Sequence, residues 1–180
     1  MAKELSVIRV ALIGPECTAK SSLSKALALH YNTLYIEEYS REYIASLDRA
    51  YLLEDILVIA QEQLIQELTA IPNANKLIFV DTELIVSKVW CEDVFQITPK
   101  WFKERLAPLK YDLYLLTYPD IPWVADSVRE NGHRRDYFYN WYQRELQAIN
   151  ATYKVVTGDG NNRLNNCIAF IEDFMRAQKK

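Results

Sequence analysis

Apolar segments of five to nine residues alternate along the chain with longer stretches whose apolar residues recur at helical spacing. The first segment, residues 5–13, is almost continuously apolar, as expected of a strand buried on both faces of a parallel sheet. The clearest helix is predicted over residues 53–68, where leucine, isoleucine and alanine form one stripe. The other apolar segments predict strands at residues 33–38, 76–80, 112–117 and 153–157.

Strands that alternate with helices predict an α/β fold, in which a five-stranded parallel sheet carries helices on both faces. Further helices are expected from residue 20 onward, at 84–94, at 99–106 and near the end of the chain. We expect a single three-layer domain over residues 1–180. Because such sheets bind ligands at the carboxyl ends of their strands, the residues that follow each strand are the candidates for function.

The composition of the chain excludes several kinds of binding partner and site. The chain of 180 residues has a net charge of −3, which argues against a protein that coats nucleic acid. No apolar run approaches the ~18 residues of a membrane span, and the first residues lack the apolar core of a signal peptide. Cys17, Cys91 and Cys167 are too far apart for a zinc site or a disulfide framework. We therefore expect a cytoplasmic protein that binds neither membranes nor nucleic acid.

Residues 14–21, G-P-E-C-T-A-K-S, follow the first strand and open a helix, as a phosphate-binding P-loop does. Lys20 would place its charge on the β- and γ-phosphates of ATP, and the Ser21 hydroxyl would ligate Mg²⁺. Ala19 replaces the second glycine of the G-x-x-x-x-G-K-[ST] pattern, and its methyl group would strain a loop of positive φ by about 1–3 kcal/mol. The predicted ATP-binding residues of the loop are Gly14, Pro15, Glu16, Cys17, Thr18, Ala19, Lys20, Ser21 and Ser22.

Two other interpretations of this loop stay open. It could be a strand–turn–helix with an incidental Lys-Ser pair, or a loop that no longer binds nucleotide tightly. A GTPase is disfavoured, because Asn75-Lys76 is followed by Leu and Ile and lacks the aspartate of the guanine-reading N-K-x-D motif.

Three more segments accompany the loop: E-Y-S-R-E-Y at 38–43, F-V-D-T at 79–82, and P-D-I-P-W-V-A-D at 119–126. With them, the chain from about residue 7 to its last helix resembles the ribosylnicotinamide kinase domain of NadR-type proteins, a P-loop group classed with AAA-type ATPases. The resemblance implies a P-loop NTPase fold and the phosphorylation, by ATP with Mg²⁺, of the 5′-hydroxyl of nicotinamide riboside to nicotinamide mononucleotide. Longer NadR proteins also carry DNA-binding and adenylyltransferase segments, and here we expect only the kinase part.

The chemistry of phosphoryl transfer assigns provisional roles to the acidic residues. Glu38 is the candidate base for the acceptor hydroxyl, with Glu37 second, because strand alternation would turn Glu37 to the other face. Glu38 could instead simply pair with Arg41. Asp81 ends the third strand like a Walker B acid and would serve Mg²⁺ or the substrate, although it could also cap the next helix, as could Thr82.

In nucleoside and nucleotide kinases the region after the fourth strand is a lid, here about residues 124–140, whose arginines reach the transferred phosphate. We therefore predict catalytic roles for Arg129, Arg134 and Arg135, although a solvated basic loop is the alternative. An aromatic platform for the acceptor ring is expected from Tyr39, Trp90 or Trp123. Gln61 and Gln63 could face the pocket, but solvated positions fit them better. Other predicted contacts are Arg41, Asp120 and Asp126 for the acceptor and Thr157 and Gly158 for adenine.

Three alternatives to a nicotinamide riboside kinase remain. One is a kinase of another nucleoside or nucleotide. The second, motivated by Ala19, is a slow or non-catalytic ATP-binding regulatory protein. The third is a relic of a P-loop protein that binds a partner. The expected partners are ATP, Mg²⁺ and a small nucleoside.

Overall fold

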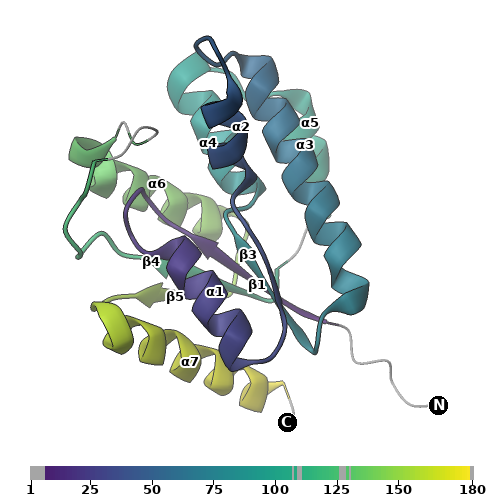
Figure 1. Ribbon diagram of the computed structural model, residues 1–180, viewed down its shortest axis with the longest axis vertical. Helices are drawn as coiled ribbons and strands as arrows, with labels where there is room; N and C mark the ends of the chain where they lie inside the picture. The colour runs from purple at the N-terminus through teal and green to yellow at the C-terminus, as the bar shows by residue number, and fades with distance from the viewer. Residues whose placement is uncertain (1–6, 107, 109–110, 126–128, 130, 179–180) are drawn as a thin grey trace.

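The computed structural model describes residues 7–106, 108, 111–125, 129 and 131–178. Within them, five parallel strands form one sheet in the order β2-β3-β1-β4-β5, which confirms the predicted sheet (Figure 1). Each strand lies within a segment that the apolar pattern predicted or differs from it by one residue at an end. The strands are β1 Ile8–Ile13, β2 Leu34–Ile36, β3 Leu77–Asp81, β4 Leu113–Thr117 and β5 Tyr153–Val156.

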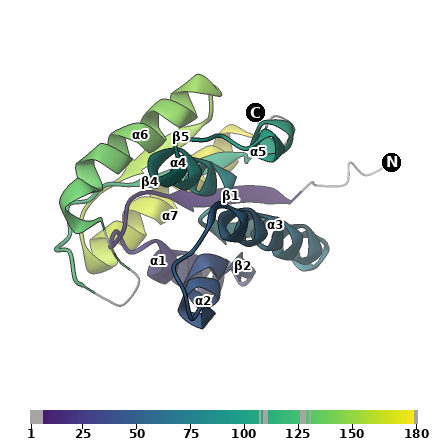
Figure 2. The same cartoon turned by 90° about the horizontal axis from the view of Figure 1, so that it is seen from above.

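Helices cover both faces of this sheet and complete the three predicted layers (Figure 2). Side chains of α1 and α7 pack on one face, and those of α4 and α6 pack on the other. The helices are α1 Lys20–His30, α2 Tyr39–Ser46, α3 Leu53–Ala70, α4 Leu84–Phe95, α5 Lys100–Leu106, α6 Arg135–Ala148 and α7 Gly160–Ala177, with 3-10 turns at Ile71–Asn73 and Gly132–Arg134.

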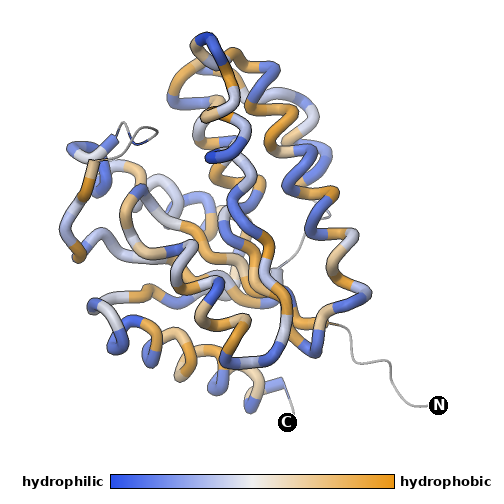
Figure 3. Tube along the Cα trace, viewed as in Figure 1, coloured by the Kyte–Doolittle hydropathy of each residue, from blue (hydrophilic) through white to orange (hydrophobic). Residues whose placement is uncertain are grey.

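The central strand β1 shows why this sequence forms a sheet that is buried on both faces. Val10 and Leu12 pack toward α1 and α7, whereas Ala11 and Ile13 pack toward α4 and α6, and all four side chains are fully buried. The strands are accordingly the most continuously apolar part of the chain (Figure 3). Since β1 pairs with β3 on one side and β4 on the other, the loop after Ile13 lies between the ends of those two strands.

A third apolar cluster joins α3, α4 and α5 above the sheet (Figure 1). Its buried members are Ile56 and Ala60 of α3, Leu84 and Cys91 of α4, and Phe102 of α5. Together with α2, these helices form a wall that rises beyond the carboxyl ends of the strands. No helix of the described residues is both long and apolar enough to cross a membrane.

Two local features differ from the sequence expectation. The second strand ends at Ile36, two residues early, because the chain turns there into α2, a helix that the apolar pattern did not predict. The segment 124–140, expected as a lid, contains two helical elements among its described residues, since η2 begins at Gly132 and the long helix α6 begins at Arg135. Arg135 and the residues after it therefore belong to a packed helix.

Candidate functional site

The loop between β1 and α1 is anchored to the end of β4. The Thr18 hydroxyl donates to the Pro15 carbonyl at 2.8 Å and lies 2.6 Å from the hydroxyl of Thr117, which donates to the carbonyl of Ile13 at 3.1 Å. Gly14 has a φ of +150°, and a Cβ atom there would lie 2.7 Å from the carbonyl oxygen of Thr117. Only glycine permits this close approach, which explains in steric terms why the loop begins with a glycine.

Ala19 occupies the left-handed region, with φ of 65° and ψ of 20°, at the N-cap of α1. The second glycine of a P-loop would adopt this conformation freely. In alanine the Cβ lies too close to the backbone, which destabilises the conformation by about 1–2 kcal/mol. The backbone strain expected if Ala19 had a positive φ is therefore present. Lys20 follows directly, and its ammonium group donates to the Pro15 carbonyl at 3.0 Å across the mouth of the loop.

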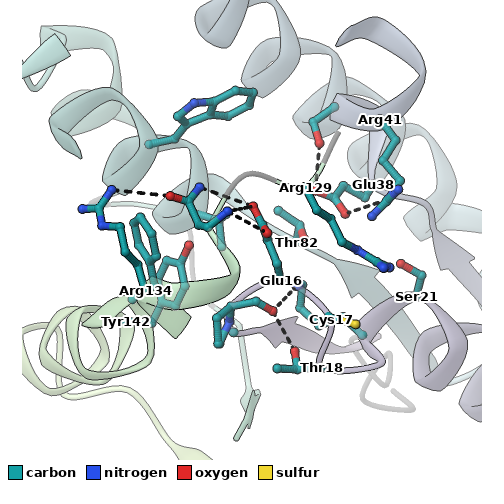
Figure 4. Close-up of a pocket in the computed structure, with 18 of the residues that line it drawn as sticks. Glu16, Cys17, Thr18, Ser21, Glu38, Arg41, Thr82, Arg129, Arg134 and Tyr142 are labelled. Atoms are coloured by element: carbon teal, nitrogen blue, oxygen red, sulfur yellow. Dashed lines mark hydrogen bonds and ion pairs between the residues drawn. The ribbon is translucent and has the colours of Figure 1, made fainter. Parts of the chain in front are cut away.

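The loop forms the floor of a cavity of about 710 Å³, a volume typical of small-molecule sites (Figure 4). One side is made by α2 and by the segment that precedes α3, another by α4, and the third by Arg129, Asn131 and the start of α6. All nine predicted loop residues line this cavity, from Gly14 to Ser22. Thr157 and Gly158, predicted to contact adenine, follow β5 and are not among its described lining residues.

Asp81 ends β3 beside the loop and is 1% exposed. Neither carboxylate oxygen makes a hydrogen bond of ordinary geometry to any described residue. Burial raises the pKa of Asp81 to about 6, and the charge of Lys20 and the hydroxyl of Ser21 oppose that rise. Asp81 is not a helix cap, because the N-cap of α4 is Glu83, whose carboxylate accepts from the Ile85 amide at 3.0 Å.

Glu37 and Glu38 point to different places, as strand alternation predicts. Glu37 is exposed and accepts a hydrogen bond from the Tyr35 hydroxyl at 2.7 Å. Glu38 lines the cavity, where it accepts from the Ser40 hydroxyl at 2.8 Å and lies 4.0 Å from the Arg41 guanidinium. The ion pair with Arg41 therefore exists, but it lies inside the cavity and leaves Glu38 facing it (Figure 4).

The three arginines after β4 occupy different environments. Arg129 lines the cavity, where its side chain points toward Ser21 in the view of Figure 4, and its guanidinium donates to the Val124 carbonyl at 2.6 Å. Arg134 also lines the cavity, but it is held by two hydrogen bonds to Asp93.

The Arg134 guanidinium is further fixed over the rings of Tyr137 and Phe138, each 4.8 Å away. Arg135 lies outside the described lining and bridges the Cys17 and Ile121 carbonyls at 3.3 and 2.8 Å. In this structure Arg129 and Arg134 line the cavity and Arg135 bonds to the backbone of the loop from outside it, a difference that the sequence could not show.

Of the three aromatic candidates, the structure places only Trp90 in the described lining. Tyr51 packs edge-to-face against it, with ring centroids 5.0 Å apart. Trp123 lies instead on Gly132, where an added Cβ would come within 2.5 Å of the indole. Tyr39 packs against Tyr43. Sequence reasoning missed Tyr51, Phe138 and Tyr142, which also line the cavity.

Asp120 belongs to a separate polar cluster around Arg163. Its carboxylate accepts from the Gly158 amide at 2.7 Å and from the Arg163 guanidinium at 2.5 Å. Burial alone would raise the pKa of Asp120, but these two donors hold it below its usual value. Arg163 is 1% exposed and also donates to the carbonyls of Gly158 and Tyr118. Asp120 therefore ties the loop after β5 to the loop after β4 and does not line the cavity. Asp126 lies outside the described residues.

Arg163 and Gln63 are among the buried polar residues whose burial was not predicted from the sequence. Arg163 lies on the buried face of α7 with Cys167 and Ile171, at a position where the helical spacing would favour an apolar residue. A charged residue at such a position was the signal in the sequence that could have indicated a buried arginine. Gln63 of α3 is 6% exposed, contrary to the solvated position expected, whereas Gln61 is exposed.

The residues present fit a magnesium ion of the kind that accompanies ATP. Mg²⁺ is held in such sites by one or two protein oxygens together with phosphates and water, so a cluster of acidic ligands is not required. The described residues contain no group of three or more His, Cys, Asp or Glu that would hold a metal by themselves. Asp81, with two buried and unbonded oxygens beside the Ser21 hydroxyl, suits that arrangement.

Comparison with known proteins agrees with the geometry. Residues 9–163 match the model of a family described as an AAA domain. The chain is 27% identical over 186 residues to the trifunctional NAD biosynthesis/regulator protein NadR of Escherichia coli (strain K12) and 28% identical over 185 residues to that of Salmonella typhimurium. These matches cover 98% of this chain but only 45% of each relative, so the chain spans about half the length of the curated relatives.

Solved structures share the fold. A NadR protein in complex with NR superposes with a TM-score of 0.81 at 24% identity, covering 94% of this chain and 52% of that one. Deoxyadenosine kinase from M. mycoides gives a TM-score of 0.64 at 11% identity, covering 92% of this chain and all of that one. The family match over most of the chain and the P-loop between β1 and α1 lead to one conclusion: this chain belongs to the AAA-domain family, and it is similar to NadR proteins along nearly its whole length.

Proposed function

We propose that this chain transfers the γ-phosphoryl group of ATP to the 5′-hydroxyl of a nucleoside, and that the nucleoside is nicotinamide riboside. The observation that carries the proposal is a single cavity with a phosphate loop as its floor and an acidic, aromatic wall opposite. The NadR relatives and the structural neighbour bound to NR support the choice of acceptor.

On the donor side, the P-loop residues serve the phosphates. The amide groups of the loop and the N-terminus of α1 attract the anionic oxygens, and Lys20 adds a full positive charge. When bound, Mg²⁺ would neutralise charge on the phosphates and would be held by Ser21 and Asp81. Arg129 contributes a second cation that reaches toward Ser21 from the opposite wall (Figure 4).

On the acceptor side, Glu38 is the proposed base. It lies in the cavity near Asp81, and the hydrogen bond from Ser40 and the Arg41 charge orient its carboxylate. The proton of the sugar hydroxyl would pass to a Glu38 oxygen as the new P–O bond forms, which contributes typically 10²–10⁴-fold to the rate. Asp81 is less suited to this role, because both of its oxygens are buried beneath the cavity.

The character of the acceptor wall favours a cationic ring. Trp90 and Tyr51 offer aromatic faces and edges to the cavity. The preference for a cation comes from these rings, because the Asp93 carboxylate in the same lining is already paired with Arg134. A positively charged nicotinamide gains about 0.5–2 kcal/mol from an aromatic face beyond its buried area. A neutral base would gain less from the same wall.

The test is a turnover measurement with ATP, Mg²⁺ and a panel of nucleosides, in which mass spectrometry identifies the phosphorylated product. Nicotinamide riboside should give the highest kcat/KM, with nicotinamide mononucleotide and ADP formed in equal amounts. Preference for another nucleoside would keep the kinase and replace the acceptor. Absence of turnover with every nucleoside, although ATP binds, would overturn the proposal.

A second candidate, a slow ATP-binding regulatory domain, is favoured by one observation, the left-handed conformation of Ala19. It predicts ATP binding with turnover that no nucleoside accelerates. The same panel separates the two, because a kinase produces ADP only in step with a phosphorylated acceptor.

A further inference from the structure

Gln63 is buried at a junction of three elements. Its side-chain oxygen accepts from the Tyr39 amide at 2.9 Å, and its side-chain nitrogen donates to the carbonyls of Glu37 at 3.0 Å and Asp81 at 3.4 Å. The amide orientation follows from these partners, because the acceptor faces an N–H group and the donors face two carbonyls. The residue comes from α3, whereas its partners lie at the ends of β2 and β3 and at the start of α2.

The two partners from the β2–α2 junction flank Glu38 on either side. With the Glu37 carbonyl and the Tyr39 amide both held, the position of the Glu38 Cα and the direction of its Cα–Cβ bond are restrained. The third bond reaches the backbone of Asp81, the other acid near the loop. One side chain thus sets the position of the two proposed functional carboxylates relative to each other.

Helix capping does not explain this arrangement. Glu38 is the N-cap residue of α2, but its carboxylate accepts from the Ser40 hydroxyl and from no backbone amide of the first turn. Gln63 satisfies the first α2 amide from outside, so the Glu38 carboxylate is not needed as a backbone cap and can face the cavity. An apolar residue at 63 would deprive these three backbone groups of the partner that Gln63 provides.

We propose that Gln63 is a positioning residue for phosphoryl transfer, which acts by holding the backbone on both sides of Glu38 and tying it to Asp81. This inference rests on the proposed function for its catalytic consequence. It goes beyond that proposal because it assigns a role to a residue that contacts neither ATP nor the acceptor. A displacement of about 1 Å at a reacting group can reduce a rate about 10²-fold, so the consequence is measurable.

The kinetic test compares Gln63→Met, which keeps length and volume but removes donor and acceptor, with Gln61→Met, which alters the exposed glutamine on the same helix. Gln63→Met should lower kcat by about 10–100-fold with the KM for ATP within twofold of wild type, whereas Gln61→Met should leave both unchanged. The effect should vanish in a Glu38→Gln background, because two residues that act as a unit are not additive. A full, multiplicative loss in the double variant would show that Gln63 does not act through Glu38.

A second measurement does not depend on catalysis. The Tyr39 amide should exchange its hydrogen at least tenfold faster in Gln63→Met than in Gln61→Met under conditions where both proteins remain folded. Unchanged exchange at Tyr39 would overturn the positioning role even if the chain is a kinase. Faster exchange of the Tyr39 amide in Gln63→Met, in a protein that phosphorylates no nucleoside, would instead support the role of Gln63 in holding the backbone and reject the proposed function.

Discussion

Asp81→Asn is predicted to make the protein more stable and less active at the same time. The wild-type carboxylate is buried, and neither oxygen is hydrogen-bonded within the described residues. Burial raises its pKa from 3.8 to about 6, so the folded protein binds this proton more tightly than the unfolded chain does. Stability should therefore fall as the pH rises from about 4 to about 6, and the loss should persist at neutral pH.

The size of the effect follows from the pKa. A rise from 3.8 to about 6 corresponds to a loss of up to about 3 kcal/mol in the free energy of unfolding once Asp81 is ionised. Asparagine has the same shape and cannot ionise, so Asp81→Asn should be about 1–3 kcal/mol more stable than wild type at pH 7. At pH 4 the two proteins should differ little.

Urea unfolding followed by tryptophan fluorescence between pH 4 and 8 measures this difference. Glu83→Gln is the matched control, because burial raises the pKa of Glu83 to about 8. The stability of wild type relative to Glu83→Gln should therefore fall over a wider pH range, from about 4.5 to 8. Turnover should be lost in Asp81→Asn if the carboxylate serves the bound nucleotide. The reasoning would be refuted if Asp81→Asn were less stable than wild type at pH 7. It would also be refuted if the free energies of unfolding of the two proteins differed by the same amount at every pH.

Three further substitutions separate the parts of the site. Lys20→Ala should abolish phosphoryl transfer with the melting temperature nearly unchanged, and wild-type turnover in that variant would show that the loop is not the catalytic one. Ala19→Gly should relieve left-handed strain and raise the free energy of unfolding by about 1 kcal/mol, while calorimetric ATP affinity improves by no more than about 1–3 kcal/mol; no change in either would mean that the loop accommodates the methyl group. Trp90→Leu should raise the KM for a cationic nucleoside about tenfold with the KM for ATP unchanged, and an equal effect on both would place Trp90 outside the acceptor site.

The inner strands β1, β3 and β4 were predictable because they are buried on both faces, which leaves a continuous apolar run such as Val10–Ile13 in the sequence. The P-loop was predictable because its spacing and its place after the first strand are local features. The short helix α2 was not, because none of its residues is buried and its first amide is satisfied by Gln63, far away in the chain.

The site was harder to predict wherever a role depends on a distant partner. Arg129, Arg134 and Arg135 look alike in sequence, but Asp93 of α4 holds Arg134 and the Cys17 carbonyl holds Arg135. Trp123 lies on Gly132, while Trp90 lines the cavity, a difference set by how α4 and η2 pack. Such pairings over dozens of residues leave no periodic signal.

The central claim is that this cavity transfers phosphate from ATP to a nucleoside with Glu38 as the base. The most direct measurement compares single-turnover rates of wild type and Glu38→Gln with nicotinamide riboside, alongside ATP affinity determined by calorimetry. The account predicts product formation by wild type, a rate about 10²–10⁴-fold lower in Glu38→Gln, and the same ATP affinity for both. Equal rates for the two proteins, or no phosphorylated nucleoside from wild type with ATP bound, would contradict it.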